Sequence, residues 1–400
     1  MKPSPATETE PKRKHRRLWL TVHLYLGLSL GLVFVLMGLT GSFLVFYTKI
    51  DNLLNPPTQA IQSTSPPSPQ AIIDKLKASY PDREAGWRIE LPMHPGDPVM
   101  ARYLKPRETQ GSDFAPLVVI LDPATLDISS SRLWGTFAST WIYDLHYTLL
   151  LDTSGKTVLA ILSIFILISL LSGIYLWWPQ AGNFRSALTY RPHAHMLRRI
   201  YDWHKLAGLY GLIVLLMLTV TGIMLERPDW FEGMLGTKVG MQHMGSMPAP
   251  AAGSHPAPKA SVSLDQMAQT ALQQFPGSEL RWIYTPDSDQ GQYQFRLYQP
   301  GEPGHRFPKT IVWINHSGQV VNIRDYFADN PGDKIMNWLH PLHNGEALGL
   351  TGRWIIVISG LLPLVLFTTG FLRWRHKQQA ANAIKDRKHR KERYQSRKKG

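Results

Sequence analysis

The chain has 400 residues, a net charge of +14 and a mean hydropathy of −0.16, values that on average describe a basic, soluble protein. It contains no cysteine. This excludes disulfides, iron–sulfur clusters and covalently attached c-type haem, because all three require cysteine sulfur. Any metal site must therefore use histidine, methionine or carboxylate ligands.

Four long apolar runs predict membrane-spanning helices, in chain order at residues 18–48, 156–178, 202–226 and 353–374. Each run reaches the about 20 residues that a helix needs to cross a bilayer. The first run follows a basic N-terminus, as in a signal peptide. It is much longer than the roughly 7–15 apolar residues of a cleaved signal, so we interpret it as a retained span.

Basic residues beside these runs predict their orientation. Residues 1–17 carry six Lys and Arg, the 179–201 loop carries four, and the tail that begins at Arg373 carries twelve. The positive-inside rule then places 1–17, 179–201 and 375–400 in the cytoplasm of a bacterial inner membrane, and 49–150 and 227–350 in the periplasm. Nucleic-acid binding could also explain a basic tail. Contact with anionic lipid explains it more simply, so we expect the bilayer and no nucleic acid as partner.

The chain repeats itself. His23, Gly27 and Thr40-Gly41 recur 181 positions later as His204, Gly208 and Thr221-Gly222. A second set recurs at an offset of 197: Trp141, His146, Lys156, Gly173 and Trp177 match Trp338, His343, Arg353, Gly370 and Trp374, the Lys and Arg sharing their charge. The fold predicted from this pattern is a membrane α-helical bundle of four spans with a two-fold internal repeat.

The two periplasmic segments are each predicted to be a small α+β domain. Residues 71–80 and 264–275 have helical patterns, and strand-like stretches follow each of them. Stretches rich in Pro, Ser and Ala at 55–69 and 248–261 are predicted linkers.

Four histidines are candidate cofactor ligands because the repeat makes them into two pairs. Both copies run in the same direction, so equivalent residues near the pseudo-two-fold axis should face each other. His23 and His204 would meet near the cytoplasmic face, and His146 and His343 at the periplasmic face. Two facing imidazoles suit a b-type haem, which takes one axial ligand from each side. His340 is a rival for His343, although its repeat counterpart is Tyr143.

Two further groups are weaker candidates. A single histidine at a membrane interface is often only a snorkelling or helix-capping residue. Basic residues at the ends of spans likewise often serve only to orient the protein in the membrane. Possible partners for haem propionates are Arg17, Arg198, Arg199, Lys156 and Arg353. The soft side chains of Met241, His243, Met244 and Met247 could bind Cu(I), but the first repeat has no such segment.

The spacing of His23 and Gly27 ahead of Thr40-Gly41, its echo at His204, and the segment from Trp338 to Gly345 resemble PepSY-associated transmembrane proteins. The outer domains look like PepSY modules, and the layout is most similar to the FoxB-type ferric-siderophore reductases of the bacterial inner membrane. The resemblance implies two b-type haems and electron delivery across the membrane to a ferric siderophore, with iron as substrate. The double-His pattern occurs only once here, because Tyr143-Asp144 stands where the second copy has His340-Pro341.

The sequence thus predicts a di-haem electron conduit and an enzyme, a ferric-chelate reductase. No Gly-x-Gly-x-x-Gly follows a strand, so the electron donor is expected to be a quinol or a separate soluble reductase. Three alternatives stay open: a copper or other metal reductase, a non-enzymatic PepSY-type regulator, and a siderophore transporter. The spans show no sign of the broken helices that a transporter typically has.

Overall fold

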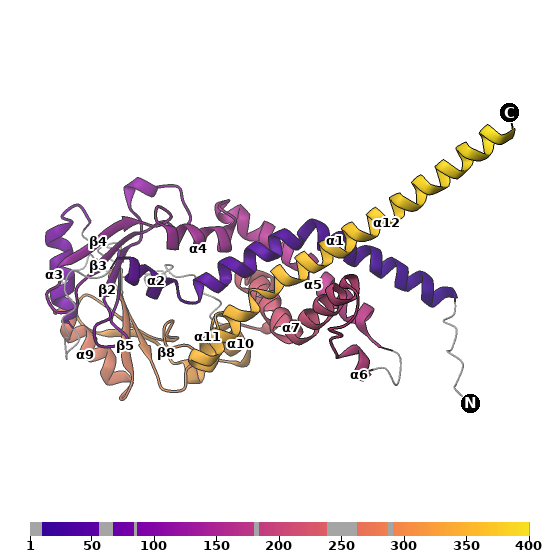
Figure 1. Ribbon diagram of the computed structural model, residues 1–400. Helices are drawn as coiled ribbons and strands as arrows, with labels where there is room; N and C mark the ends of the chain where they lie inside the picture. Colours follow the sequence, from indigo (N-terminus) through magenta and orange to yellow (C-terminus); the bar gives the residue numbers. More distant parts are fainter. Residues whose placement is uncertain are drawn as a thin grey trace. The chain divides into compact units, whose positions relative to one another are not determined.

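The computed structural model describes residues 10–55, 67–83, 86–179, 184–237, 262–286 and 291–399 (Figure 1). Contacts divide the chain into two compact units. A helical unit comprises Met1–Ser42, Ala160–Ile223 and Ile355–Gly400, and a sheet unit comprises Phe43–Leu159 and Met224–Trp354.

Four helices are long and apolar enough to cross a membrane, among the residues that the structure describes. They are α1 (Glu10–Leu44), α5 (Asp152–Trp177), α7 (Met196–Glu226) and a fourth span made of α11 (Gly349–Ser359) and α12 (Leu362–Lys399). All four predicted apolar runs thus lie in helices, but the boundaries differ. The first run ends as a helix at Leu44, and a separate helix α2 (Tyr47–Leu54) follows it. Helix α12 continues through the basic segment that was predicted as a tail.

The fourth span is interrupted at Gly360-Leu361, between α11 and α12, which the sequence did not lead us to expect. Pro363 accounts for the break, because proline has no N–H to donate to the carbonyl four residues earlier. Helix α1 crosses the span at this point so closely that a Cβ on Gly38 would overlap the carbonyl oxygen of Gly360. Ser42 Oγ donates a hydrogen bond to the carbonyl of Val357 (2.9 Å), which replaces a bond of the interrupted helix.

The sheet unit contains one antiparallel sheet of eight strands in the order β4-β3-β2-β1-β5-β6-β7-β8. The strands are β1 (Trp87–Glu90), β2 (Val99–Tyr103), β3 (Leu117–Leu121), β4 (Ile128–Leu133), β5 (Glu279–Tyr284), β6 (Tyr293–Tyr298), β7 (Thr310–Ile314) and β8 (Val320–Arg324). Where the sequence predicted two separate α+β domains, the structure has their strands in one sheet, because β1 pairs with β5. This pairing removes two strand edges that would otherwise expose unpaired backbone groups.

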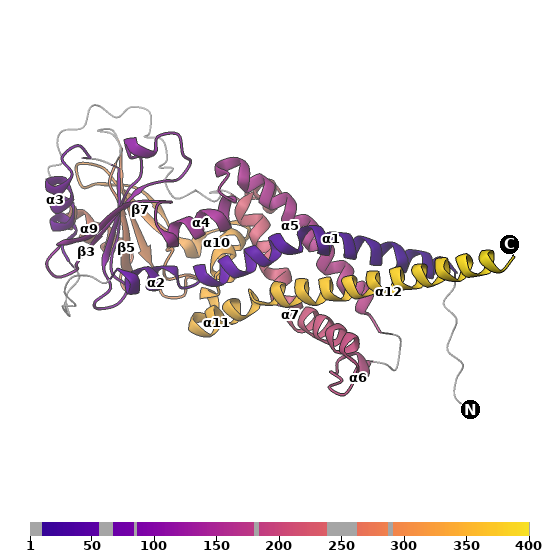
Figure 2. The ribbon, with the colours of Figure 1, turned by 45° about the horizontal axis from the view of Figure 1, so that its top comes forward.

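The two faces of this sheet differ in the helices that cover them (Figure 2) and in the chemistry of their side chains. Helices α3 (Pro69–Ser79) and α9 (Leu264–Gln274) cover one face over an apolar core that includes Ile89, Ile283 and Phe295. Each of these helices starts at a serine N-cap, Ser68 or Ser263. The alternate positions on the strands point to the other face, and there they include buried arginines such as Arg88 and Arg296.

The helices on the arginine-bearing side include α4 (Ala138–Thr148) and α10 (Pro331–His343), which carry the predicted histidines of this unit. The remaining short helices are α6 (Phe184–Ala187), α8 (Asp229–Leu235), η1 (Arg107–Thr109), η2 (Tyr326–Ala328) and η3 (Glu346–Leu348). The two histidine-bearing helices therefore stand against a polar layer, and the apolar core lies on the opposite face of the sheet.

Candidate functional site: two histidine pairs

The structure brings His23 of α1 and His204 of α7 together inside the helical unit. Their ring centroids are 6.2 Å apart and their planes are inclined by 86°. Both side chains are partly buried among the spanning helices. A polar ring in such a place is costly unless it has partners or a function.

The Nδ1 atom of each imidazole faces a backbone carbonyl. His23 Nδ1 lies 3.1 Å from Ser169 O and 2.9 Å from Ser172 Oγ. Because a carbonyl oxygen can only accept, Nδ1 must carry the proton and donate it. The lone pair of the neutral ring is then on Nε2, where a metal would be bound.

His204 has the same surroundings on the fourth span. Its Nδ1 lies 3.0 Å from Leu366 O and 3.0 Å from Thr369 Oγ1. The partners of the two rings are related by the sequence offset of 197, so the equivalence extends beyond the histidines to the groups that orient them. The serine and threonine were not identified from the sequence, although the shared offset pointed to their positions.

A glycine lies beside each of these rings. A Cβ on Gly173 would stand 3.4 Å from Cε1 of His23, and a Cβ on Gly370 would stand 3.4 Å from Cε1 of His204. Both were matched positions of the repeat. Among the glycines that follow the histidines along α1 and α7, Gly31 leaves room for Phe367 to pack against α1, and Gly27 has no neighbouring atom within 4 Å of its Cβ position.

The sheet unit contains the second pair. His146 of α4 and His343 of α10 have ring centroids 6.3 Å apart and planes inclined by 55°. The rival His340 instead packs against Phe307, with a centroid distance of 4.3 Å. Asn344 Nδ2 donates to Nδ1 of His340 (3.2 Å), so the proton of the neutral ring is on Nε2 and no lone pair is left for a metal.

Burial keeps His340 neutral. Desolvation, with smaller contributions from the charges of Lys309, His343 and Arg306, lowers its pKa to about 3. The side chain nevertheless keeps some accessible surface, as do His343 and Arg306.

Both pairs have the separation that a shared metal requires. A metal–imidazole bond of about 2 Å and roughly 1.2 Å from ring nitrogen to centroid place two trans imidazoles about 6.4 Å apart between centroids. The observed 6.2 and 6.3 Å match this value. The residues present fit the group that the sequence predicts.

The predicted propionate partners are mostly engaged with the protein. Lys156 pairs with Asp113, and Arg353 donates to the carbonyl of Val45. Arg198 lies 3.3 Å from the buried carboxylate of Asp202, and Arg199 donates to Tyr190 Oη (3.0 Å). Arg17 is exposed near the start of α1. The assignment of these five residues to propionates stays a prediction.

Met241, His243, Met244 and Met247 lie outside the described residues. Within the described part of the chain, no group of three or more His, Asp or Glu side chains is arranged to hold a metal ion. The copper site therefore also stays a prediction.

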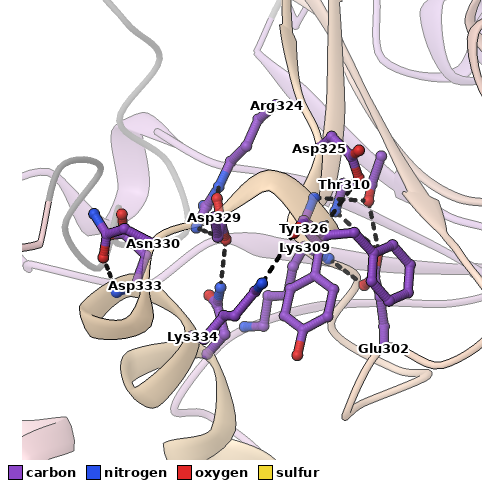
Figure 3. A network of polar contacts seen from close by, with 12 residues as sticks. Glu302, Lys309, Thr310, Arg324, Asp325, Tyr326, Asp329, Asn330, Asp333 and Lys334 are labelled. Atoms are coloured by element: carbon purple, nitrogen blue, oxygen red, sulfur yellow. Dashed lines mark hydrogen bonds and ion pairs between the residues drawn. The ribbon is translucent and has the colours of Figure 1, made fainter.

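A polar network lies at the start of α10, the helix that ends at His343 (Figure 3). Arg324 of β8 forms an ion pair with Asp329 (2.9 Å), and Asp329 accepts a hydrogen bond from Asn337 of α10 (2.8 Å). Asn330 caps the helix by accepting from the backbone N–H of Asp333 (2.9 Å). The helix that carries His343 is thus capped at its start by Asn330 and linked to β8 through Asn337, Asp329 and Arg324.

These features define a class of protein: a multi-pass membrane protein that carries an α+β unit with an antiparallel sheet. Residues 20–377 match the PepSY-associated TM region family, and the chain belongs to that family. No curated protein matches the chain.

Proposed function

We propose that the chain is a ferric-chelate reductase of the bacterial inner membrane, with both termini in the cytoplasm, that carries electrons across the membrane by means of two b-type haems. The observation that supports this most directly is the spacing of 6.2 and 6.3 Å in the two histidine pairs. One such pair could be a chance contact between polar rings. Two histidine pairs at matched positions of the repeat favour a shared role in binding a cofactor.

The residues of the chain have separate roles in this proposal. His23 and His204 hold the first haem, and His146 and His343 hold the second. The carbonyl oxygens of Ser169 and Leu366 accept the Nδ1 protons of the first pair, so that the lone pair of each neutral ring is on Nε2, where it would bind the metal. When bound, each haem supplies a centre that accepts and releases one electron.

The proposed substrate is Fe(III) held by a siderophore on the periplasmic side, at two PepSY-like halves that share the sheet. Fe(II) has a lower charge and is a softer ion than Fe(III), so hard oxygen chelators hold it less tightly and release it. The donor is a membrane quinol or a soluble reductase. Under this proposal, the internally duplicated layout of the chain is like that of FoxB-type ferric-siderophore reductases.

One observation favours a transporter as the second candidate. The fourth span is broken at Gly360, and transporters often bind substrates at broken helices. Here, however, Ser42 Oγ donates a hydrogen bond to the carbonyl of Val357, and the backbone at Gly38 packs against the break. The break thus functions as a packing contact, and we favour the reductase.

An absorption spectrum of the purified full chain tests the proposal. Reduction by dithionite should produce the α and Soret bands of bis-histidine haem b, with two haems per chain. His23→Ala and His146→Ala should each remove one haem, whereas His193→Ala, in an exposed loop position, should remove none. A wild-type protein without haem rejects the proposal, and loss of haem in the His193 variant rejects the ligand assignment.

A further inference from the structure

The polar face of the sheet contains a cluster of charges that we call the Glu90 cluster: Arg88, Glu90, Arg102, Arg306 and Tyr47. Arg88 Nη2 lies 2.6 Å from Glu90 Oε1, and Arg102 Nε lies 3.3 Å from the same oxygen. Arg306 Nη2 donates to Tyr47 Oη (2.9 Å). Burial by itself would raise the pKa of Glu90, but the three guanidinium groups hold that pKa below its usual value.

Positive charge exceeds negative charge in this cluster, because one carboxylate faces three guanidinium groups. Arg102 directs a second donor at Met100 Sδ (3.2 Å), which is a weak acceptor. Among the described residues, the guanidinium of Arg306 has no carboxylate within ion-pair distance; Glu346 instead binds the backbone N–H of Arg306 (2.7 Å). Tyr47 and Glu90 favour the charged form of Arg306. The excess of guanidinium groups over carboxylates still suits the cluster to receive an anion.

Arg306 connects the cluster to α10. Its neighbour Phe307 packs against His340, with a centroid distance of 4.3 Å. His340 precedes His343 by three residues, which is about one helical turn, so the two lie on the same side of α10. The positive charge of Arg306 is close enough to contribute to the lowered pKa of His340.

Tyr47 connects the cluster to α4 in the same way. Its ring packs against Tyr143, with a centroid distance of 5.8 Å, and Tyr143 precedes His146 by three residues. Tyr143 and His340 are matched positions of the repeat. The cluster therefore reaches both helices one turn away from the paired histidines.

We infer that Arg306 and Arg102, with the hydroxyl of Tyr47, form a carboxylate-binding site beside the His146–His343 pair. Arg306 is only partly buried as a residue. The planar fork of a guanidinium binds a carboxylate through two parallel hydrogen bonds. The carboxylate belongs either to a propionate of the haem or to an anionic ferric chelate, and this inference rests on the proposed function.

Arg306→Gln removes the charge, Arg306→Lys keeps the charge without the fork, and Arg83→Gln is the matched control. Arg83 is an arginine of the same unit that already pairs with Glu108. Three measurements are made on the full chain in detergent: the midpoint potential of each haem against pH, reoxidation of the reduced protein by ferric citrate and by a cationic ferric hydroxamate, and thermal stabilisation by citrate alone.

If a propionate occupies the site, Arg306→Gln lowers the potential of one haem and alters its pH dependence, with equal effects on both chelates. If the chelate occupies it, Arg306→Gln slows reoxidation by ferric citrate about tenfold or more, spares the hydroxamate and leaves both potentials unchanged. Arg306→Lys should recover part of either effect.

The inference is overturned if Arg306→Gln behaves like Arg83→Gln in all three measurements. A wild-type protein without haem rejects the proposed function instead. In that case, thermal stabilisation by citrate alone tests the inference. If the wild type is stabilised by citrate and Arg306→Gln is not, the carboxylate site is supported. If citrate does not stabilise the wild type, the inference is overturned.

Discussion

The crossing of α1 with the broken fourth span gives a sharp prediction for Gly360→Ala. The new Cβ would overlap both Ser42 Oγ and the carbonyl oxygen of Gly38, and the latter is backbone that cannot rotate away. Overpacking of this kind costs about 1–3 kcal/mol. Displacement of Ser42 also breaks its bond to Val357, worth about 1 kcal/mol. We therefore expect the free energy of unfolding to fall by about 2–4 kcal/mol.

Unfolding of the full chain by a denaturing detergent in mixed micelles, followed by far-UV circular dichroism, measures this loss. Ser42→Ala should lose only the hydrogen bond, about 1 kcal/mol. Gly27→Ala is the matched control, because a Cβ at Gly27 meets no atom within 4 Å and alanine favours a helix by up to about 1 kcal/mol. If Gly360→Ala unfolds at the same detergent fraction as Gly27→Ala, the close crossing is wrong.

Three further outcomes follow from the sheet unit. His343→Ala should remove one haem and His340→Ala should remove none, as judged by the haem content per chain; the reverse result would make His340 the ligand. Desolvation raises the pKa of Asp144 from its ordinary value of 3.8 to about 6, so ionisation of this carboxyl disfavours the folded state progressively between these two pH values and fully above them. Asp144→Asn should then raise the free energy of unfolding increasingly as the pH rises from about 4 to 6. The gain should stay below the roughly 3 kcal/mol of a two-unit shift, because the side chain is partly exposed. Denaturant unfolding at several pH values measures it, and a gain that is the same at all pH values would refute this. Arg324→Gln and Asp329→Asn should each destabilise the chain by about 1–3 kcal/mol, and together by less than the sum, in a double-mutant cycle read by denaturant unfolding; strict additivity would show that the pair does not hold α10.

The spans and the histidine positions could be predicted because their signals are local or periodic. An apolar run of sufficient length leaves few alternatives to a spanning helix. The offsets of 181 and 197 placed His23 opposite His204 and His146 opposite His343 without any knowledge of packing. Equivalent positions in two parallel copies are related by an axis, and residues near that axis approach each other.

Contacts between segments distant in sequence could not be predicted in this way. The pairing of β1 with β5 depends on which strand edges meet, and the residue pattern of a strand does not specify the strand that pairs with it. Pro363 was visible, but proline in a span can bend, break or simply end a helix. The close approach of Gly38 decides its effect here.

By itself, the sequence determined that four helices are long enough to cross a membrane and that four histidines occupy matched positions. Tertiary structure alone decided which nitrogen of His23 and His204 carries the proton, because Ser169 and Leu366 belong to other helices. It also placed His343, and not His340, beside His146, and it placed Phe307, the neighbour of Arg306, against His340. Chain periodicity selects the face of a helix, whereas the atoms opposite that face come from elsewhere in the chain and are set only by folding.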